Sequence, residues 1–438
     1  MLTEDSRRGS SELIAFPGLI DCHVHFREPG NTDAEDMRSG AEAAWSGGVT
    51  TVCDMPNTDP PTSTVAALRE KIARWEIIRN QPFEALTLQQ AQGHPERSRG
   101  VKGSQALNGK SEIRNIDMRF FFGATKSEHI LEFQKVMQSE ELKKYVPGVK
   151  LYLGHSTGNQ KAEEGIAGEV FQVCSKLGLP VVCHCEDEGV IRENQKGLGL
   201  GLGLGIDTHS KIRSIEAAVK ATTYAIHLAR EYGTHLHIAH LSTRDELELV
   251  KQAKKEGLRV TCEVAPHHLF LTVDDYKTLG TFAKMNPPLR THEHTEALWR
   301  GIEDKTVDCI ASDHAPHTIA SKRTKNPLDA PSGVPGAETM LPLLLSCALG
   351  EGPWDAQGKP RCQMSDVRFQ ISDIVRLLYD KPNSIFSLGK PEWNPGKPHS
   401  IVVNPRETWL IRGKELHSKC GWTPYEGWKV TGRIETFS

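Results

Sequence analysis

Long apolar runs are missing from this sequence of 438 residues, and no stretch reaches the ~18 residues that a membrane-spanning helix needs. Residues 1–11 are polar and lack the hydrophobic core of a secretory signal. An excess of one charge is also missing, since the formal net charge is only −3 at pH 7. This near balance argues against nucleic acid or another polyanion as a partner. We therefore expect a cytoplasmic protein that acts on neither membranes nor nucleic acids.

Cysteine pairs of the C-x-x-C type are absent, although the chain has ten cysteines. They are Cys22, Cys53, Cys174, Cys183, Cys185, Cys262, Cys309, Cys347, Cys362 and Cys420. Several lie within apolar runs typical of strands, so we expect reduced, buried thiols of a cytosolic protein. In Cys183-His184-Cys185, the alternation of a strand turns both cysteines away from the histidine. Only His184 therefore remains as a candidate ligand in this motif.

Two stretches lack any periodicity that predicts a helix or a strand. Residues 84–115 are polar, and we expect an inserted loop there, between the second and third structural units. Residues 197–206 repeat the dipeptide Gly-Leu, but they do not match G-x-G-x-x-G and no phosphate-loop lysine follows. We interpret this repeat as a low-complexity insertion rather than a nucleotide site.

Strand-like and helix-like patterns alternate through most of the chain. The expected strands cover residues 18–25, 49–54, 117–124, 149–153, 179–184, 235–240, 258–264 and 307–312. The expected helices cover residues 65–79, 127–145, 162–177, 214–232, 244–256 and 293–304, and another begins near residue 338. Strands that alternate with helices pair in parallel, and eight such units predict an α/β fold, a (β/α)8 barrel of the TIM type.

The composition of the chain changes after residue 351. We expect the barrel to span residues 16–350 and a C-terminal segment to span residues 351–438. This segment has a helix-like stretch at residues 371–379 and β-like stretches at residues 399–403 and 429–435. Because few residues precede Phe16, we expect the two chain termini to form a small and incomplete accessory β-sheet.

The stretch from Asp21 to Arg27 combines two histidines and an arginine on an expected strand. Side chains alternate along a strand, so His23, His25 and Arg27 should share one face and Cys22 should lie on the other. Two imidazoles two residues apart can bind one metal ion. The guanidinium beyond them can then hold an anionic substrate beside the metal.

Four more residues that can serve a metal site lie at the ends of later strands: Lys150, His184, His240 and Asp313. The carboxyl ends of barrel strands meet at one face, where the active sites of this fold lie. Nitrogen and oxygen ligands without thiolate suit Zn2+ with open coordination positions. The sequence therefore predicts a catalytic zinc site that these residues build together with His23 and His25.

Lys150 has two interpretations, because an ammonium group has no lone pair for a metal and is costly to bury beside one. In the first, the side chain pairs with a carboxylate and is structural. In the second, the neutral amine reacts with CO2 to give a carbamate, whose oxygens can bridge two metals. The apolar neighbours of Lys150 in the sequence fit a buried strand end.

Other polar residues near strand ends are candidates for catalysis or substrate binding. Asp313 can both ligate a metal and transfer a proton. His317 follows four residues later and can contact a substrate. Asn57 and Asn286 can hydrogen-bond an amide-like ring or a carboxylate, although asparagine also favours turns. Glu263 is a candidate for either an accessory ligand or a group that orients the ligands.

The order of the motifs resembles that of the dihydroorotases, within the amidohydrolase superfamily. The matching motifs are FPGLIDCHVHFREPG, DMPNT, GVKLYLG, VVCHCED, HIAHLST, VTCEVAPHHLFLT, KMNPPLR, ASDHAPHT and GVPGAETMLPLLL. They extend roughly from Phe16 to Leu345, interrupted only by the two insertions. The resemblance is to the branch of the family in which a lysine, rather than an aspartate, bridges the metals.

This resemblance implies a site with two Zn2+ ions and a carbamate, derived from CO2, on Lys150. The metal ligands would be His23, His25, Lys150, His184, His240 and Asp313. The first two histidines and Asp313 would hold one metal, the later two histidines would hold the other, and Lys150 would bridge them. The substrate-binding residues would be Arg27, Asn57, Asn286 and His317, with residues 154–158 as a covering loop.

The reaction that the resemblance implies is the reversible cyclisation of N-carbamoyl-L-aspartate to L-dihydroorotate plus water, in pyrimidine (UMP) biosynthesis. A hydroxide held between the metals would attack the ring, and Asp313 would shuttle the proton. For the assembly, the resemblance leaves open a homodimer or an association with aspartate transcarbamoylase.

Two other functions compete with this one. A hydantoinase or allantoinase would share the barrel and the metals, but its substrate ring lacks a carboxylate. Arg27, together with Pro56 and Asn57, argues for a carboxylate-bearing substrate. A non-catalytic, dihydroorotase-like partner of aspartate transcarbamoylase should have lost metal ligands, whereas this sequence has all of them.

Overall fold

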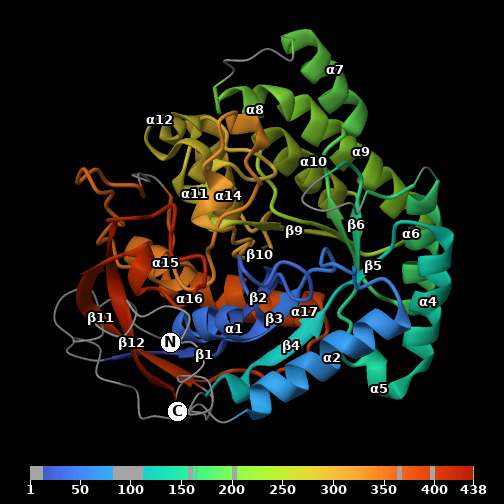
Figure 1. Ribbon diagram of the computed structural model, residues 1–438, viewed down its shortest axis with the longest axis horizontal. Helices are drawn as coiled ribbons and strands as arrows, with labels where there is room; N and C mark the ends of the chain where they lie inside the picture. Colours follow the sequence, from blue (N-terminus) through green and yellow to red (C-terminus); the bar gives the residue numbers. More distant parts are fainter. Residues whose placement is uncertain are drawn as a thin grey trace.

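The computed structural model describes residues 13–81, 112–155, 161–163, 165–199, 205–362, 367–394 and 400–437. Figure 1 shows parallel strands at the centre of the molecule with helices around them. A separate sheet, whose two C-terminal strands are drawn in red, lies at one side. The strands at the centre form the scaffold that positions the candidate site.

The central strands form a barrel of two parallel, hydrogen-bonded sets. The first set, in the order β2-β3-β4, consists of β2 (Leu19–Val24), β3 (Val49–Asp54) and β4 (Asp117–Phe120). The second set runs in sequence order through β5 (Phe122–Gly123), β6 (Val149–Tyr152), β7 (Val181–His184), β8 (Leu236–Ile238), β9 (Val260–Val264) and β10 (Cys309–Ile310). Only Phe121 separates β4 from β5, and a parallel bridge between Val24 and His314 joins the last strand to the first. The predicted (β/α)8 barrel is therefore confirmed.

Helices connect most of the strands and cover the outside of the barrel (Figure 1). The main ones are α1 (Met37–Ser46), α2 (Val65–Asn80), α4 (Ser127–Gln138), α6 (Ile166–Leu177), α9 (Ile215–Tyr232), α10 (Arg244–Lys255), α13 (His292–Glu303) and α15 (Met340–Ala348). All of these except α1 overlap predicted helices, and α7 (Glu188–Leu198) is a further helix that was not predicted. The start of α1 does carry a signal, because Asp36 and Ser39 form a capping box there. Among the described residues, no helix is long and apolar enough to cross a bilayer.

The two predicted insertions lie largely outside the described residues. Of the first, only the short 3-10 turn Glu112–Asn115 is described. The second overlaps the end of α7 (Glu188–Leu198), and residues 200–204 lie outside the description.

The accessory sheet is antiparallel and contains three strands. β1 (Ile14–Pro17) pairs with β11 (Ser400–Leu410), which pairs with β12 (Lys429–Phe437). The sheet packs against the barrel through Trp45 of α1 and Phe437 of β12, whose rings stack with centroids 3.9 Å apart. The short N-terminal segment thus does provide a strand, and the predicted sheet from the two chain termini is present.

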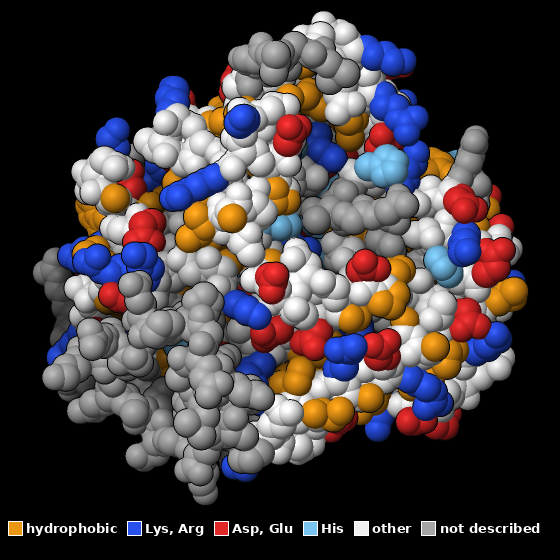
Figure 2. Space-filling model, in the orientation of Figure 1, with side chains coloured by type: hydrophobic (Ala, Val, Ile, Leu, Met, Phe, Trp, Pro, Cys, Tyr) orange, Lys and Arg blue, Asp and Glu red, His pale blue; other side chains and the backbone are white. Residues whose placement is uncertain are grey.

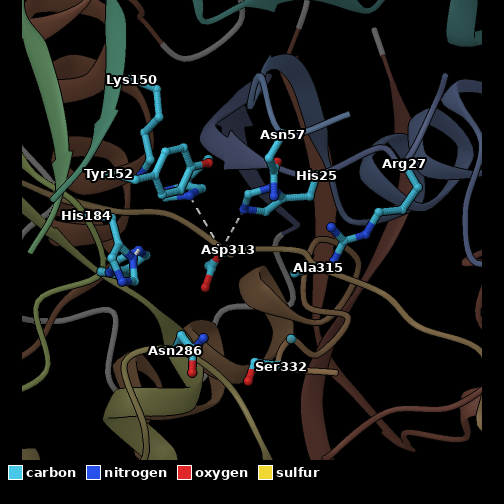
Figure 3. A pocket seen from close by; sticks show the side chains of 13 residues that line it. His25, Arg27, Asn57, Lys150, Tyr152, His184, Asn286, Asp313, Ala315 and Ser332 are labelled. Carbon is cyan, nitrogen blue, oxygen red and sulfur yellow. Dashed lines mark hydrogen bonds and ion pairs between the residues drawn. The ribbon is translucent and has the colours of Figure 1, made fainter. Parts of the chain in front are cut away.

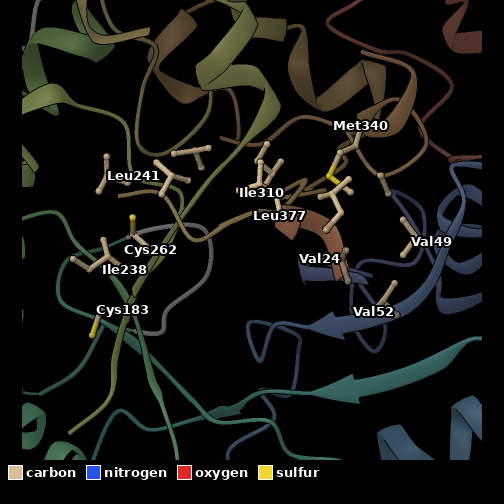
Figure 4. Packing of buried hydrophobic residues seen from close by; sticks show 14 of the residues in the cluster. Val24, Val49, Val52, Cys183, Ile238, Leu241, Cys262, Ile310, Met340 and Leu377 are labelled. Atoms are coloured by element: carbon tan, nitrogen blue, oxygen red, sulfur yellow. The ribbon is translucent and has the colours of Figure 1, made fainter. Parts of the chain in front are cut away.

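The apolar core has two layers. One layer lies between the strands and the surrounding helices, and Figure 4 shows part of it around Val24, Val49, Ile238, Ile310 and Met340. The other layer fills the inside of the barrel. This inner layer includes Ile385, the last residue of α17 (Lys381–Ile385), and Phe386 and Leu388, which follow that helix. The metal-ligand candidates therefore stand above a packed core rather than an open channel.

The prediction that all the cysteines are reduced is wrong for one pair. Cys347 and Cys362 form a disulfide across 15 residues of sequence, with Cα atoms 6.0 Å apart. The other eight are free and buried, as predicted. The pair escaped prediction because it links the end of α15 to an irregular segment, a contact that no local pattern reveals.

An ion pair between Lys71 of α2 and Asp54 of β3 is almost completely buried. The Lys71 Nζ atom lies 2.5 Å from Asp54 Oδ2, and Asp54 Oδ1 accepts the N–H of Phe26 at 2.9 Å. This carboxylate therefore joins a helix, the end of β3 and the segment after β2 that contains His25.

We expect Lys71→Ala to lower the free energy of unfolding by about 3–5 kcal/mol, because Asp54 would keep a buried charge without its cation. Arg69→Ala, on the same helix, is the matched control. Arg69 pairs with Glu141 at 3.0 Å on the surface, so its loss should cost about 1 kcal/mol or less. Urea unfolding measures both, and equal losses would contradict a structural role for the buried pair.

Candidate active site

One pocket at the carboxyl ends of the barrel strands contains every residue that the sequence suggested as a metal ligand (Figure 3). These residues are His23, His25, Lys150, His184, His240 and Asp313. Arg27, Asn57 and Asn286 line the same pocket. Strand ends that are distant in sequence thus converge, as expected for parallel strands in a closed barrel.

His23, His25 and Asp313 form the tightest group in the pocket. Asp313 Oδ1 lies 3.2 Å from His25 Nε2 and 3.5 Å from His23 Nε2. The ligand atoms of the three residues all lie within 4.8 Å of one another. Two imidazole nitrogens and a carboxylate oxygen that converge in this way fit three ligand positions around one divalent ion.

A second layer of residues fixes which ring nitrogen of each histidine faces the group. His25 Nδ1 lies 2.5 Å from Asn57 Oδ1, so it carries the hydrogen and leaves the Nε2 lone pair free. His23 Nδ1 donates to Glu263 in the same way. Glu263 therefore orients a ligand, which is one of the two roles considered for it. Asn57 contacts a ligand rather than lying free for substrate alone, and this contact is one that the sequence did not indicate.

His184 and His240 form a second pair on the other side of the pocket. His184 Nδ1 and His240 Nε2 lie 3.1 Å apart, and His184 Nε2 lies 2.9 Å from Glu186 Oε2. When His184 donates from Nε2 to Glu186 and His240 carries its hydrogen on Nδ1, His184 Nδ1 and His240 Nε2 face each other with lone pairs. Two neutral imidazoles facing each other in this way fit a shared cation. Arg213 forms an ion pair with the same Glu186 carboxylate, which holds it in place.

The backbone is left-handed at two of the candidate ligands, with φ of 35° at His240 and 47° at Asp313. Residues with a side chain seldom adopt this conformation, and such residues concentrate at functional sites. The Ser312 side chain, one residue earlier, donates to the buried carboxylate of Asp21 at 2.5 Å. The end of β10 is therefore tied to β2 at the point where Asp313 turns into the pocket.

Lys150 lies on β6 and is only 1% exposed, yet its Nζ has no hydrogen-bond partner among the described residues. Burial lowers the pKa of its ammonium group, which favours the neutral amine. His23 Nε2 is likewise buried without a hydrogen-bond partner in the described part of the chain. Orphaned nitrogens around one space, with no thiolate among them, fit a site for metal ions of the zinc type.

The Asp313 carboxyl group is buried, which by itself would raise its pKa, but His23, His25 and His267 bring the pKa well below its usual range. Asp313 is thus a carboxylate at neutral pH and can accept a proton. His267, which the sequence analysis did not single out, lies 4.0 Å from Asp313 Oδ2. Its position after β9 in the motif EVAPHH is the signal that could have found it.

Arg27 is a buried guanidinium without a carboxylate partner among the described ion pairs. Its Nε donates to the Pro316 carbonyl at 3.1 Å, and its Nη2 lies 3.2 Å from His317 Nε2. Burial lowers the Arg27 pKa to about 10, so the group stays charged at neutral pH. His317 thus lies against Arg27, and Trp422 Nε1 donates to the His317 carbonyl at 2.7 Å.

Two further predicted substrate contacts are Asn286 and the loop at residues 154–158. Asn286 lines the pocket, and its Oδ1 lies 3.0 Å from His209 Nε2. Of the predicted covering loop, residues 156–158 lie outside the described residues. The N–H of His155, just before them, donates to Glu188 at 2.9 Å.

The strict alternation predicted for β2 is wrong at Cys22. Its thiol donates to Glu263 at 3.4 Å, so it reaches the same carboxylate as its neighbour His23. The pairing of β2 with β3 shifts register between Asp21 and Val24, which explains why the two-residue period fails there.

A model for the family described as "Amidohydrolase family" matches residues 14–340. The dihydroorotase of Methanosarcina mazei is 31% identical over 455 residues, which covers 97% of this chain and 84% of that protein. The dihydroorotase of Bacillus subtilis is 30% identical over 437 residues, with 96% and 84% covered. The multifunctional protein CAD of Squalus acanthias is 33% identical over 430 residues, but the chain spans only 14% of its length.

Among solved structures, the L-hydantoinase of Arthrobacter aurescens superimposes with a TM-score of 0.79 at 24% identity, covering 96% of this chain and 83% of that one. At this identity the likeness shows the fold alone. The family model, in contrast, covers more than half of the chain, and the dihydroorotases match it over most of their own length. The chain therefore belongs to the amidohydrolase family and, within it, to the dihydroorotases.

Proposed function

We propose that this chain catalyses the reversible cyclisation of N-carbamoyl-L-aspartate to L-dihydroorotate plus water, with two zinc ions per chain. One observation carries the choice of substrate. Arg27 is a buried cation that has no carboxylate partner among the described residues, and it lines the same pocket as the metal-ligand candidates. A substrate with a ring amide and a carboxylate satisfies both features at once.

The metal ligands in this proposal are grouped as the geometry suggests. His23, His25 and Asp313 would hold one ion, and His184 and His240 would hold the other. Lys150 would supply anionic oxygens to both as a carbamate, because a buried neutral amine can add CO2 with the release of a proton. When bound, the two ions supply Lewis acidity at the ring carbonyl and an activated water.

The protein residues then carry the remaining tasks. Arg27 fixes the substrate carboxylate, which places the ring amide next to the metal ligands. Asp313 accepts the proton of the attacking water and passes it to the leaving ring nitrogen. Asn286 supplies an amide group at the edge of the pocket for the ring. In the direction of ring closure the same carboxyl group returns the proton, and water leaves.

A hydantoinase remains the main competing function, because the solved hydantoinases share this fold. A hydantoin ring has no carboxylate, so Arg27 would stay buried and unpaired, which costs about 2–5 kcal/mol. Substrate choice therefore separates the two functions.

The first prediction concerns the bridge. Lys150→Ala should bind fewer than two metals per chain, because the bridging oxygens are lost, and short carboxylic acids should restore part of the activity. Metal analysis after gel filtration measures the content. Lys254→Ala is the control, since Lys254 pairs with Asp308 away from the pocket. Two metals and normal turnover in Lys150→Ala would rule out the bridging role.

The second prediction concerns the proton. Asp313→Asn should lower turnover by about 10²-fold or more, because general acid-base assistance is typically worth ~10²–10⁴-fold. In the wild type, hydrolysis should be favoured at higher pH and ring closure at lower pH, because the carboxylic acid that loses water reacts in its protonated form. Initial rates in both directions between pH 6 and pH 9 test this. A variant that keeps both metals and a tenth of the activity would show that another group moves the proton.

The third prediction concerns substrate choice. The wild type should process dihydroorotate far better than hydantoin, dihydrouracil or allantoin. Arg27→Met should lose most of the dihydroorotate activity and keep its metals. Arg38→Met is the matched control, because Arg38 is also buried but donates to the Ile78 carbonyl on α2. Comparable rates on rings without a carboxylate would assign the chain to the hydantoinase type of activity instead.

A further inference from the structure

Tyr152 is the last residue of β6, and its hydroxyl group is buried without a hydrogen-bond partner among the described residues. The residue is 3% exposed and lines the candidate active site. A phenol hydroxyl that is buried without a partner loses about 1–3 kcal/mol, so it normally finds one. The ligand of this pocket is the partner that remains.

The direction of the side chain narrows the choice of partner. Tyr152 lies two residues after Lys150, on the same face of β6, and its ring is 5.1 Å from Lys150 Nζ. In Figure 3, the ring lies beside Lys150 and the hydroxyl points toward Asn57 and His25, on the side of the pocket where Arg27 lies. Burial raises the pKa of the Tyr152 hydroxyl group, and the charge of Asp313 raises it further while that of Arg27 lowers it. The hydroxyl therefore faces the space between the metal ligands and Arg27.

Arg27 alone does not fill all the acceptor positions of a bound carboxylate. The Nε of Arg27 donates to the Pro316 carbonyl, and Nη2 lies 3.2 Å from His317 Nε2, which also lies 3.0 Å from the Ser332 carbonyl. A guanidinium fork gives a carboxylate two parallel N–H bonds, whereas the carboxylate offers about four acceptor positions. Asn57 accepts from His25 through Oδ1, and its Nδ2 group is a donor on the side of His25. On the side of β6, Lys150 and Tyr152 line the pocket, and because Lys150 is assigned to the metal site, Tyr152 is the donor there for a carboxylate at Arg27.

We propose that Tyr152 is a specificity-determining residue whose hydroxyl donates a hydrogen bond to the carboxylate of the substrate that Arg27 binds. This inference rests on the proposed function, since it names a further contact to the same carboxylate. It separates the recognition of the carboxylate from the chemistry at the ring amide. Arg27, in the segment after β2, supplies the charge, and Tyr152 supplies a neutral donor from β6 on the opposite side of the pocket.

The test is Tyr152→Phe, which removes the hydroxyl and keeps the ring. We expect KM and the dissociation constant for L-dihydroorotate to rise at least tenfold, as for the loss of a hydrogen bond to a charged group. The value of kcat should stay within about twofold, because the reacting amide is not contacted. Binding of dihydrouracil, which has the ring but no carboxylate, should not change. Calorimetry with both compounds measures binding even without turnover.

Two controls keep the result specific. Tyr379→Phe removes another buried hydroxyl, which donates to the Pro391 carbonyl at 2.8 Å, away from the pocket, and should change neither constant. Metal content and thermal unfolding of Tyr152→Phe should match the wild type. In the double variant with Arg27→Met, the Tyr152 effect should largely disappear, since both residues bind the same group.

Several outcomes would overturn the inference. An equal fall in kcat on both rings would place the hydroxyl at the reacting amide, and a loss of metal would place it at Lys150. Unchanged binding of dihydroorotate would show that it has no role in recognition. A wild type that binds dihydroorotate through Tyr152 but does not turn it over would contradict the proposed function and leave this inference standing.

Discussion

The parallel closure between the last barrel strand and the first is the interaction on which the site depends. Val24 and His314 form the bridge, and the His25 N–H donates to the His314 carbonyl at 2.8 Å. Without it, His25 and Asp313 would belong to distant parts of the chain. With it, a hydrogen bond of the backbone sets the distance between two ligand candidates. The precision of the site is thus a property of the barrel rather than of a loop.

Side chains behind the histidines fix the orientation of their rings. Glu263, Asn57 and Glu186 each take one ring nitrogen of a histidine, which leaves the other nitrogen turned inward. Glu263 is itself held by His237, whose Nε2 lies 3.1 Å away. His23, His25 and His184 therefore have their tautomers and ring orientations set before any ion arrives. Such preorganisation lowers the reorganisation that binding and catalysis would otherwise require.

The barrel and the group of ligand candidates could be predicted from the sequence because both depend on local patterns, namely the two-residue alternation of strands and the polar residues at strand ends. His23 and His25 are two residues apart on a strand, and Lys150, His184 and Asp313 recur at strand ends. Parallel strands bring such ends together, so no long-range information was needed. The same period could have identified Tyr152, which is two residues beyond Lys150.

The features that escaped prediction depend on contacts across the chain. Asn57 and His317 lie against His25 and Arg27, and no spacing in the sequence reveals those directions. Cys22 turns to Glu263 because of a register shift between two strands. The disulfide of Cys347 joins segments that no pattern places side by side. In each case a tertiary contact overrides the local rule.

The left-handed backbone at His240 and Asp313 has an evolutionary consequence. Holding a residue with a side chain in that conformation costs about 1–2 kcal/mol, which glycine would avoid. Replacement of either residue by glycine would therefore relieve the backbone strain, whereas selection for a working pocket retains both side chains. At these two positions the demands of folding and of chemistry are opposed. A descendant released from its catalytic task would be expected to lose these residues before those that build the barrel.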